Sequence, residues 1–221
     1  MQAFGVEEFK QLAEKGHTVV DVRNAEVLSL GQVPGSLAVY FDETFIERLG
    51  EVTEDDEQLL LIADEGQLTA LQKAVRAANF TNVKGYLQGG YQAWHSAGNP
   101  SDLLILIEAD ELKMDYQFDE FYLIDIRSTE DFAQERLEDA ENIPLVDLAQ
   151  TLPNLETANS YYVYGATANE AITAGSLFKR NGFEIVRVVA DDYETIKTAG
   201  IPLFNIKKKK GDRSSSKEES L

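Results

Sequence analysis

The stretch Leu59-Leu60-Leu61-Ile62-Ala63-Asp64-Glu65-Gly66-Gln67-Leu68-Thr69-Ala70 decides how the rest of the chain is interpreted. Its four leading aliphatic residues are typical of a strand buried on both faces of a helix-covered parallel sheet. A turn follows, and then apolar residues recur at helical spacing at Leu68, Leu71, Val75 and Ala78. A strand that runs into a tight turn and a helix start gathers backbone N–H groups in one place, which favours anions. Ligand sites of α/β sheets lie at such strand ends, but this turn holds Asp64 and Glu65 and no nucleophile.

Length and composition indicate an ordered, acidic protein of one or two domains. The chain has 221 residues, 43% of them hydrophobic, and a formal charge of −19. A surface of this charge repels nucleic acid and anionic membranes. No apolar run is long enough for a membrane span, and the first residues lack a signal-peptide pattern, so we expect a cytoplasmic protein. The absence of cysteine excludes disulfides, thiolate zinc sites and a persulfide on the chain itself. We expect no cofactor and no metal.

The chain contains the same order of landmarks twice. The strand that ends in Asp21-x-Arg23 recurs 104 positions later as the strand that ends in Asp125-x-Arg127. Three further pairs of segments correspond at nearly the same spacing, namely 59–66 with 161–168, 79–83 with 181–186, and 97–100 with 199–202. Near-constant spacing over separate landmarks indicates a duplicated domain.

Strands alternate with helical segments inside each copy, so the sequence predicts an α/β fold. We expect two domains, each an open and mostly parallel sheet with helices on both faces. The predicted divisions are residues 1–101, residues 102–206, and a basic, serine-rich disordered tail at 207–221.

These landmarks resemble the rhodanese (sulfurtransferase) family. The first copy matches its pattern at Asp-x-Arg, then at Gly31-x-Val33-Pro34-Gly35-Ser36-Leu37, and finally at Gly-Gly-x-x-Ala-Trp-x-x-Ala-Gly-x-Pro over residues 89–100. The second copy departs from the pattern. Glu138 and Asp139 replace Pro-Gly, Asp191 and Asp192 replace Gly-Gly, and Ile196 replaces Trp94.

The resemblance also implies where an active loop would lie. Members that transfer sulfur carry a loop resembling Cys-x-x-Gly-x-Arg, whose cysteine becomes a persulfide. In this chain the cysteine, glycine and arginine positions hold Ala63, Gly66 and Leu68 in the first copy and Gly165, Ala168 and Glu170 in the second. Because a methyl group or a hydrogen cannot carry sulfane sulfur, both copies are predicted to be catalytically silent.

A narrower resemblance concerns residues 63–90. It is similar to the rhodanese modules of metallo-β-lactamase-fold persulfide dioxygenases, in which a first rhodanese copy is often degenerate. The metal-binding domain is absent here, and His17 and His95 cannot make its site. The resemblance implies an accessory part that works beside a separate sulfur enzyme.

We therefore predict a pseudo-sulfurtransferase that binds a protein partner or an anion. The candidate anion loop is the second one, Gly165, Ala166, Thr167, Ala168 and Asn169, and the degenerate first loop is Ala63, Asp64, Glu65 and Gly66. The Asp-x-Arg pairs are interpreted as structural, because no nucleophile lies nearby, and Trp94 is interpreted as a core residue.

Two alternatives remain open. One is a weak sulfurtransferase or phosphatase-like enzyme that uses Thr69 or Thr167. The other is a stabilising half of a larger complex.

Overall fold

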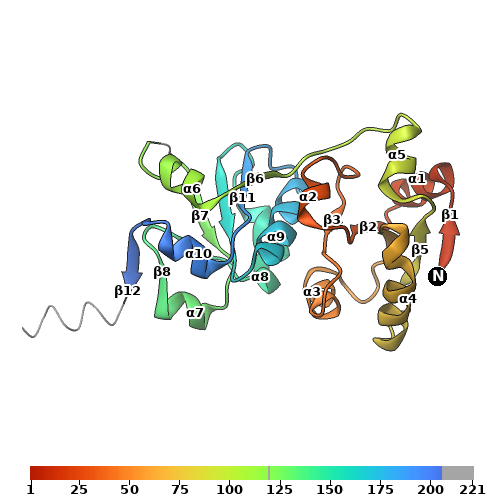
Figure 1. The fold of residues 1–221 in the computed structure, drawn as a ribbon, viewed down its shortest axis with the longest axis horizontal. Coiled ribbons are helices and arrows are strands. Elements are labelled where there is room, and N and C mark those ends of the chain that lie inside the picture. The colour runs from red at the N-terminus through yellow and green to blue at the C-terminus, as the bar shows by residue number, and fades with distance from the viewer. Residues whose placement is uncertain (119, 206–221) are drawn as a thin grey trace, which may run out of the picture.

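The computed structural model describes residues 1–118 and 120–205, which form two α/β halves side by side (Figure 1). The predicted tail at 207–221 lies outside the described residues.

The first half is built on a five-stranded parallel sheet in the order β1-β5-β4-β2-β3. Its strands are β1 (Gln2–Phe4), β2 (Thr18–Asp21), β3 (Leu37–Ala38), β4 (Leu59–Ile62) and β5 (Val83–Leu87). Its helices are α1 (Val6–Glu14), α2 (Ala25–Leu28), α3 (Phe45–Val52), the 3-10 turn η1 (Glu65–Gln67), α4 (Leu68–Ala77) and α5 (Gly90–Ser96). Helices α1 and α5 pack on one face of the sheet, and α3 and α4 pack on the other.

The second half repeats this plan in the order β6-β11-β10-β7-β9. Its parallel strands are β6 (Ile105–Ile107), β7 (Tyr122–Asp125), β9 (Glu141–Asn142), β10 (Tyr161–Tyr164) and β11 (Val186–Val189). Its helices are α6 (Ala109–Asp115), α7 (Thr129–Gln134), α8 (Leu145–Thr151), the 3-10 turn η2 (Leu152–Asn154), α9 (Ala168–Arg180) and α10 (Tyr193–Thr198). An antiparallel pair, β8 (Glu135–Leu137) with β12 (Leu203–Asn205), is added outside this sheet.

The predicted α/β class with two mostly parallel sheets is confirmed. The two copies even share register, because Asp21 pairs with the last residue of β4 and Asp125 pairs with the last residue of β10. The sequence of residues 36–41 favours a short strand, but only Leu37–Ala38 form one. Beyond Ala38 the N–H groups of Val39 and Phe41 still donate to the carbonyls of Asp21 and Val22, but no further residue of this segment pairs in register with β2.

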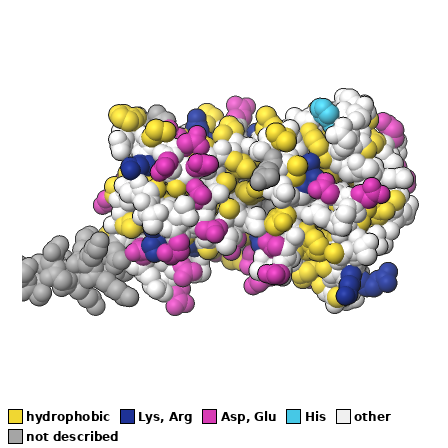
Figure 2. Space-filling view, viewed as in Figure 1, with side chains coloured by type: hydrophobic (Ala, Val, Ile, Leu, Met, Phe, Trp, Pro, Cys, Tyr) yellow, Lys and Arg dark blue, Asp and Glu magenta, His cyan; other side chains and the backbone are white. Residues whose placement is uncertain are grey.

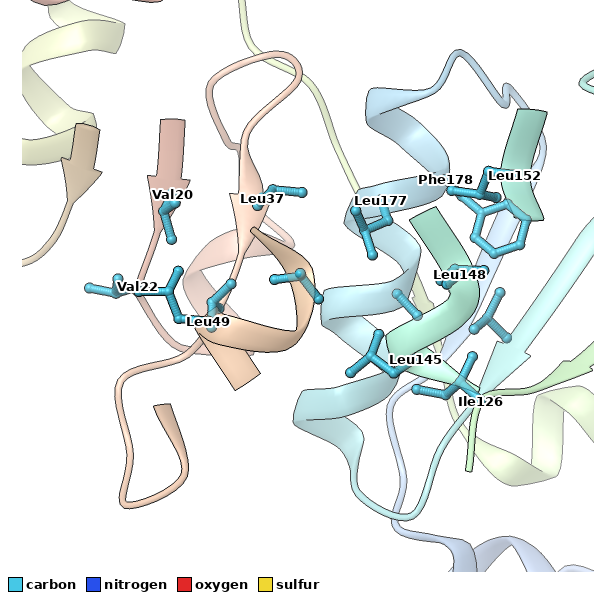
Figure 3. Packing of buried hydrophobic residues seen from close by; sticks show 14 of the residues in the cluster. Val20, Val22, Leu37, Leu49, Ile126, Leu145, Leu148, Leu152, Leu177 and Phe178 are labelled. Atoms are coloured by element: carbon cyan, nitrogen blue, oxygen red, sulfur yellow. The ribbon is translucent and has the colours of Figure 1, made fainter. Parts of the chain in front are cut away.

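The two halves share one apolar core. Figure 3 shows side chains of β2, β3 and α3 on one side, facing those of α8 and α9 on the other. Helix α9 is buried over the whole span 171–178, because it packs on its own sheet and also against β3 of the first half. Gly175 makes the close approach possible, since a Cβ at this position would overlap the Val188 side chain.

Helix α9 also satisfies the open edge of the first sheet. The Ala38 N–H donates to Ser176 Oγ at 2.9 Å, and Thr173 Oγ1 donates to the Ala38 carbonyl at 2.8 Å. Both hydroxyl-bearing residues are fully buried. An edge strand that would otherwise expose unpaired backbone groups is thus covered by a helix of the other half.

We expect Thr173→Val to lower the free energy of unfolding by about 1–3 kcal/mol, because it leaves the buried Ala38 carbonyl without that donor. Thr151→Val is the matched control, since Thr151 makes a similar hydrogen bond to the carbonyl of Asp147 on helix α8, where the bond is exposed. Urea denaturation measures both changes. Equal losses in the two variants would contradict a role for this contact between the halves.

Candidate functional site

Ala63 follows β4 directly and is one of the residues that line a cavity of about 540 Å³. Residues of the strand end, of η1 and of the segment between β5 and α5 line this cavity, among them Arg23, Ala63, Leu68, Tyr86, Gly90 and Tyr91. Ala63 itself is only 3% exposed. The first predicted loop therefore lies at a strand-end pocket, and a nearly buried alanine stands at the position of the family's nucleophile.

The backbone of this first loop is partly open. The Asp64 N–H donates to the Gln67 side-chain oxygen at 3.2 Å, and the Gln67 N–H donates to the Asp64 carbonyl. The N–H groups of Glu65 and Gly66 have no partner within residues 1–118 and 120–205. Asp64 and Glu65 are both exposed and line the cavity, and their negative charges oppose a free anion.

A glycine pair brings α5 close to this loop. Gly90 has φ +58°, and a Cβ there would lie 2.8 Å from the Ala63 carbonyl oxygen. The preceding Gly89 has φ +77° and is the N-cap of α5. Only glycine allows both this backbone conformation and this approach.

The second loop begins at Gly165, directly after β10, and carries its own carboxylates. The N–H groups of Ala166 and Thr167 donate to Glu170 Oε2 at 3.0 and 3.1 Å. The Ala168 N–H donates to Asp192 Oδ1 at 3.0 Å. Three backbone amides of the predicted anion loop, those of residues 166–168, are therefore already hydrogen-bonded within the chain.

Asn169, the last residue of the predicted anion loop, faces the other half of the molecule. Its side-chain amide donates to Asp42 Oδ2 at 3.1 Å. Anion binding at residues 165–169 stays a prediction, and an anion there has to displace Glu170 and Asp192.

We call the strand-end loop that starts at Ala63 the first cradle and the one that starts at Gly165 the second cradle. Each Asp-x-Arg pair holds a neighbouring loop in place beside one of these cradles. Arg23 donates from Nε and Nη2 to the fully buried Asp21 carboxylate at 2.9 and 2.7 Å, and Nη2 also donates to the Gly31 carbonyl. Burial raises the pKa of the Asp21 carboxyl, and the hydrogen bonds from Arg23 oppose this rise. The Arg23 guanidinium lies 4.3 Å from the centre of the Tyr91 ring.

The second copy builds the same unit. Arg127 donates to Asp125 at 2.6 Å and to the Glu135 carbonyl at 2.8 Å, and its guanidinium lies 3.4 Å from the Tyr193 ring centre. Tyr164 adds a hydroxyl hydrogen bond to Asp125. Burial raises the pKa of the Tyr164 hydroxyl, with a further contribution from this carboxylate. Both pairs are thus fully engaged in positioning loops.

Comparison with known families agrees with this duplicated geometry. The rhodanese-like domain family matches residues 5–97 and again residues 107–199. The chain belongs to the rhodanese-like family. It contains two rhodanese-like domains in tandem and no cysteine, so both active-site cysteines are absent.

Among solved structures, a crystal structure of the Alr3790 protein from Anabaena sp. is 24% identical to this chain, with a TM-score of 0.42. The match covers 49% of this chain and 99% of the Anabaena chain. A thiosulfate sulfurtransferase from Pseudomonas aeruginosa is 14% identical over 93% of this chain, with a TM-score of 0.41, and this chain covers 44% of it. A search of curated proteins gives no match.

The tandem rhodanese-like repeat keeps some of its special backbone geometry without glycine. Gly35 has φ +73°, and its counterpart Asp139 has φ +63°. In place of Gly90, by contrast, Asp192 is an extended N-cap residue with φ −71°, and its side chain reaches back to Ala168. The change from glycine to aspartate thus helps to fill the second rhodanese-like cradle.

The other candidate residues have structural environments. Thr167 Oγ1 accepts the Glu170 N–H as a helix cap, and Thr69 lies exposed on α4. His95 stacks on Tyr91 with a ring distance of 6.0 Å. Trp94 is buried and donates to the Pro100 carbonyl. Among the described residues there is no cluster of three or more metal-binding side chains, and no helix there has the length and apolar content that a bilayer crossing needs.

Replacing Glu170 should open the second rhodanese-like cradle. In Glu170→Ala the amides of Ala166 and Thr167 lose their carboxylate partner, so we expect phosphate to shift their NMR signals in the variant and not in the wild type. The lost capping should cost about 1 kcal/mol of stability. Glu194→Ala, which removes an exposed carboxylate of α10, is the control. Equal phosphate shifts in the wild type and in Glu170→Ala would show that the internal carboxylate does not block the site.

Proposed function

We propose that this chain is a non-catalytic tandem rhodanese-like protein that acts as a binding or accessory module. The observation that carries the proposal is the pair of residues at the two strand ends, Ala63 and Gly165. Sulfur transfer in this fold needs a thiolate that attacks and then holds a sulfur atom. Neither residue supplies one.

The arrangement of the charged residues supports the same proposal. The buried arginines Arg23 and Arg127 are each paired with an aspartate and with a loop carbonyl, so they hold the scaffold in place. The threonines considered as substitute nucleophiles have no histidine beside them: His17 follows α1, and His95 lies on α5 against Tyr91. No observation favours the alternative of a weak sulfurtransferase or phosphatase.

The first cradle is the better candidate for ligand contact. It keeps a cavity of about 540 Å³ and the free N–H groups of Glu65 and Gly66, whereas the second cradle is filled by Glu170 and Asp192. We propose a protein partner, with a sulfur-metabolism enzyme of the cytoplasm as the first class to test. This link to sulfur rests on the family alone.

The test is a thiosulfate–cyanide sulfurtransferase assay, with calorimetric titration of thiosulfate, sulfite and phosphate in parallel. We expect no thiocyanate above a heat-inactivated control. Turnover clearly above that control would refute the non-catalytic assignment. NMR shifts confined to residues 64–67 on titration would assign the first loop as an anion site, and a lack of shifts at both loops would leave protein binding as the function.

A further inference from the structure

One long segment of this acidic chain contains no acidic residue. Asp and Glu make up 39 of the 221 residues, yet none occurs in the 36 residues from Gly66 to Ser101. The same segment holds the bases Lys73, Arg76 and Lys84. It forms the end of η1, all of α4, β5 and α5, and most of the lining of the first cradle.

The bases of α4 meet at one surface. Lys73 and Arg76 line a shallow hollow of about 370 Å³ on the outer face of α4, together with Thr69, Gln72 and Ala77. In Figure 2 basic side chains stand out at the lower right, over the end of α4, apart from the acidic side chains over α3. Lys73 and Arg76 are both exposed.

These two bases are unpaired, unlike many others in the chain. The side chains of Lys73 and Arg76 form no ion pair or hydrogen bond with any described residue. By contrast, Arg48 and Arg180 are bound to Asp42 and Glu57. Nothing within residues 1–118 and 120–205 neutralises the charge on α4, so a carboxylate from another molecule can approach it without displacing an internal partner.

We infer that the outer face of α4 docks an acidic helical segment of a partner protein. Lys73 and Arg76 are three residues apart on one helix, which places their charges about one turn apart. Carboxylates at i and i+3 or i+4 of a partner helix have the same spacing. A nucleic acid fits less well, because a net charge of −19 opposes a polyanion with one charge about every 1.7 Å.

This inference rests on the proposed function, since it gives the binding module a surface and a class of partner. The two fail separately. Thiocyanate turnover would refute the non-catalytic assignment but would not affect the result for α4. Failure of the peptide to bind at α4 would refute the docking site but would not affect the non-catalytic assignment.

The probe is a fluorescein-labelled helical peptide with glutamates at i and i+4, measured by fluorescence anisotropy against the whole chain at low and at physiological salt. In Lys73→Glu/Arg76→Glu we expect the peptide affinity to fall about tenfold, because two exposed charge pairs become repulsive. Lys10→Glu/Lys15→Glu is the control, since it changes the net charge equally on α1 and at its C-cap. Circular dichroism and the midpoint of thermal unfolding verify that both variants fold.

Three outcomes overturn the inference. Equal loss of affinity in the two double variants would mean that only net charge matters. Tighter binding of a single-stranded RNA oligonucleotide through the same two residues would assign the face to nucleic acid. A wild-type dimer in sedimentation that Lys73→Glu/Arg76→Glu dissociates would assign it to a second copy of the chain. Peptide-induced changes in the NMR signals that are confined to residues 69–77 would support the inference.

Discussion

Arg127→Leu should lower the free energy of unfolding by about 3–5 kcal/mol, the loss expected when one partner of a buried ion pair is removed. Asp125 is fully buried and accepts hydrogen bonds from Arg127 Nε and Nη2. Without the guanidinium, the carboxylate keeps only the Arg127 backbone N–H and the Tyr164 hydroxyl among its described partners. The Glu135 carbonyl also loses its donor, and the Tyr193 ring loses the cation that stacks on it.

Urea denaturation followed by circular dichroism measures this loss. The control is Arg187→Leu, because Arg187 lies over the Tyr162 ring at 5.3 Å on the half-exposed side of β11, and we expect a loss below about 1 kcal/mol there. In the double variant Asp125→Asn/Arg127→Leu the orphan charge is gone, so part of the stability should return. If Arg127→Leu cost no more than Arg187→Leu, the loop-holding role of the pair would be wrong.

In Ala63→Cys we expect the chain to take up one sulfur atom per molecule from thiosulfate. Position 63 already carries a Cβ and lines the first cavity, so a cysteine there adds only one sulfur atom next to that cavity. The free amides of Glu65 and Gly66 favour the thiolate over the thiol. The thiolate attacks the outer sulfur of thiosulfate, a new S–S bond forms, and sulfite leaves with the electron pair of the broken bond. Adding Leu68→Arg should increase the rate, because it offsets Asp64 and Glu65.

The matched variant in the second domain is Gly165→Cys/Glu170→Arg, and we expect it to take up little or no sulfur. A Cβ at position 165 would lie 3.0 Å from Ile126 Cδ1 and 3.2 Å from Glu170 Cβ, so the side chain enters a closed loop. Intact-protein mass and sulfite release measure both variants. Equal loading of the two cysteines would show that the second cradle is as open as the first.

The sequence predicted the parts of the fold that depend on local pattern. Continuous apolar runs indicate β4 and β10. Asparagine favours helix N-caps, and Asn24 caps α2 by accepting the Val27 N–H. The short edge strands β1 and β6 were not predicted. Three residues such as Gln2–Phe4 carry no periodicity, and pairing with β5 makes them a strand. The β8–β12 pair joins residues far apart in sequence, which local pattern cannot show.

For the two cradles, too, the sequence predicts some features and not others. The missing nucleophiles at Ala63 and Gly165 are readable residue by residue. The closure of the second loop was partly readable as well, because Thr167-x-x-Glu170 is a capping-box sequence. The contact from Asp192 to Ala168 is not readable, since it spans 24 residues. The contact of α9 with the edge of β3 is likewise a product of how the two domains pack.

We expect a rhodanese framework that is present twice without a cysteine to hold no transferred sulfur. The most direct measurement is the intact mass of the wild-type chain after incubation with thiosulfate and, separately, with a low-molecular-weight persulfide, with Ala63→Cys as the positive control. We expect an unchanged wild-type mass and the gain of one sulfur atom in Ala63→Cys. A covalently bound sulfur on the wild-type chain would contradict this expectation.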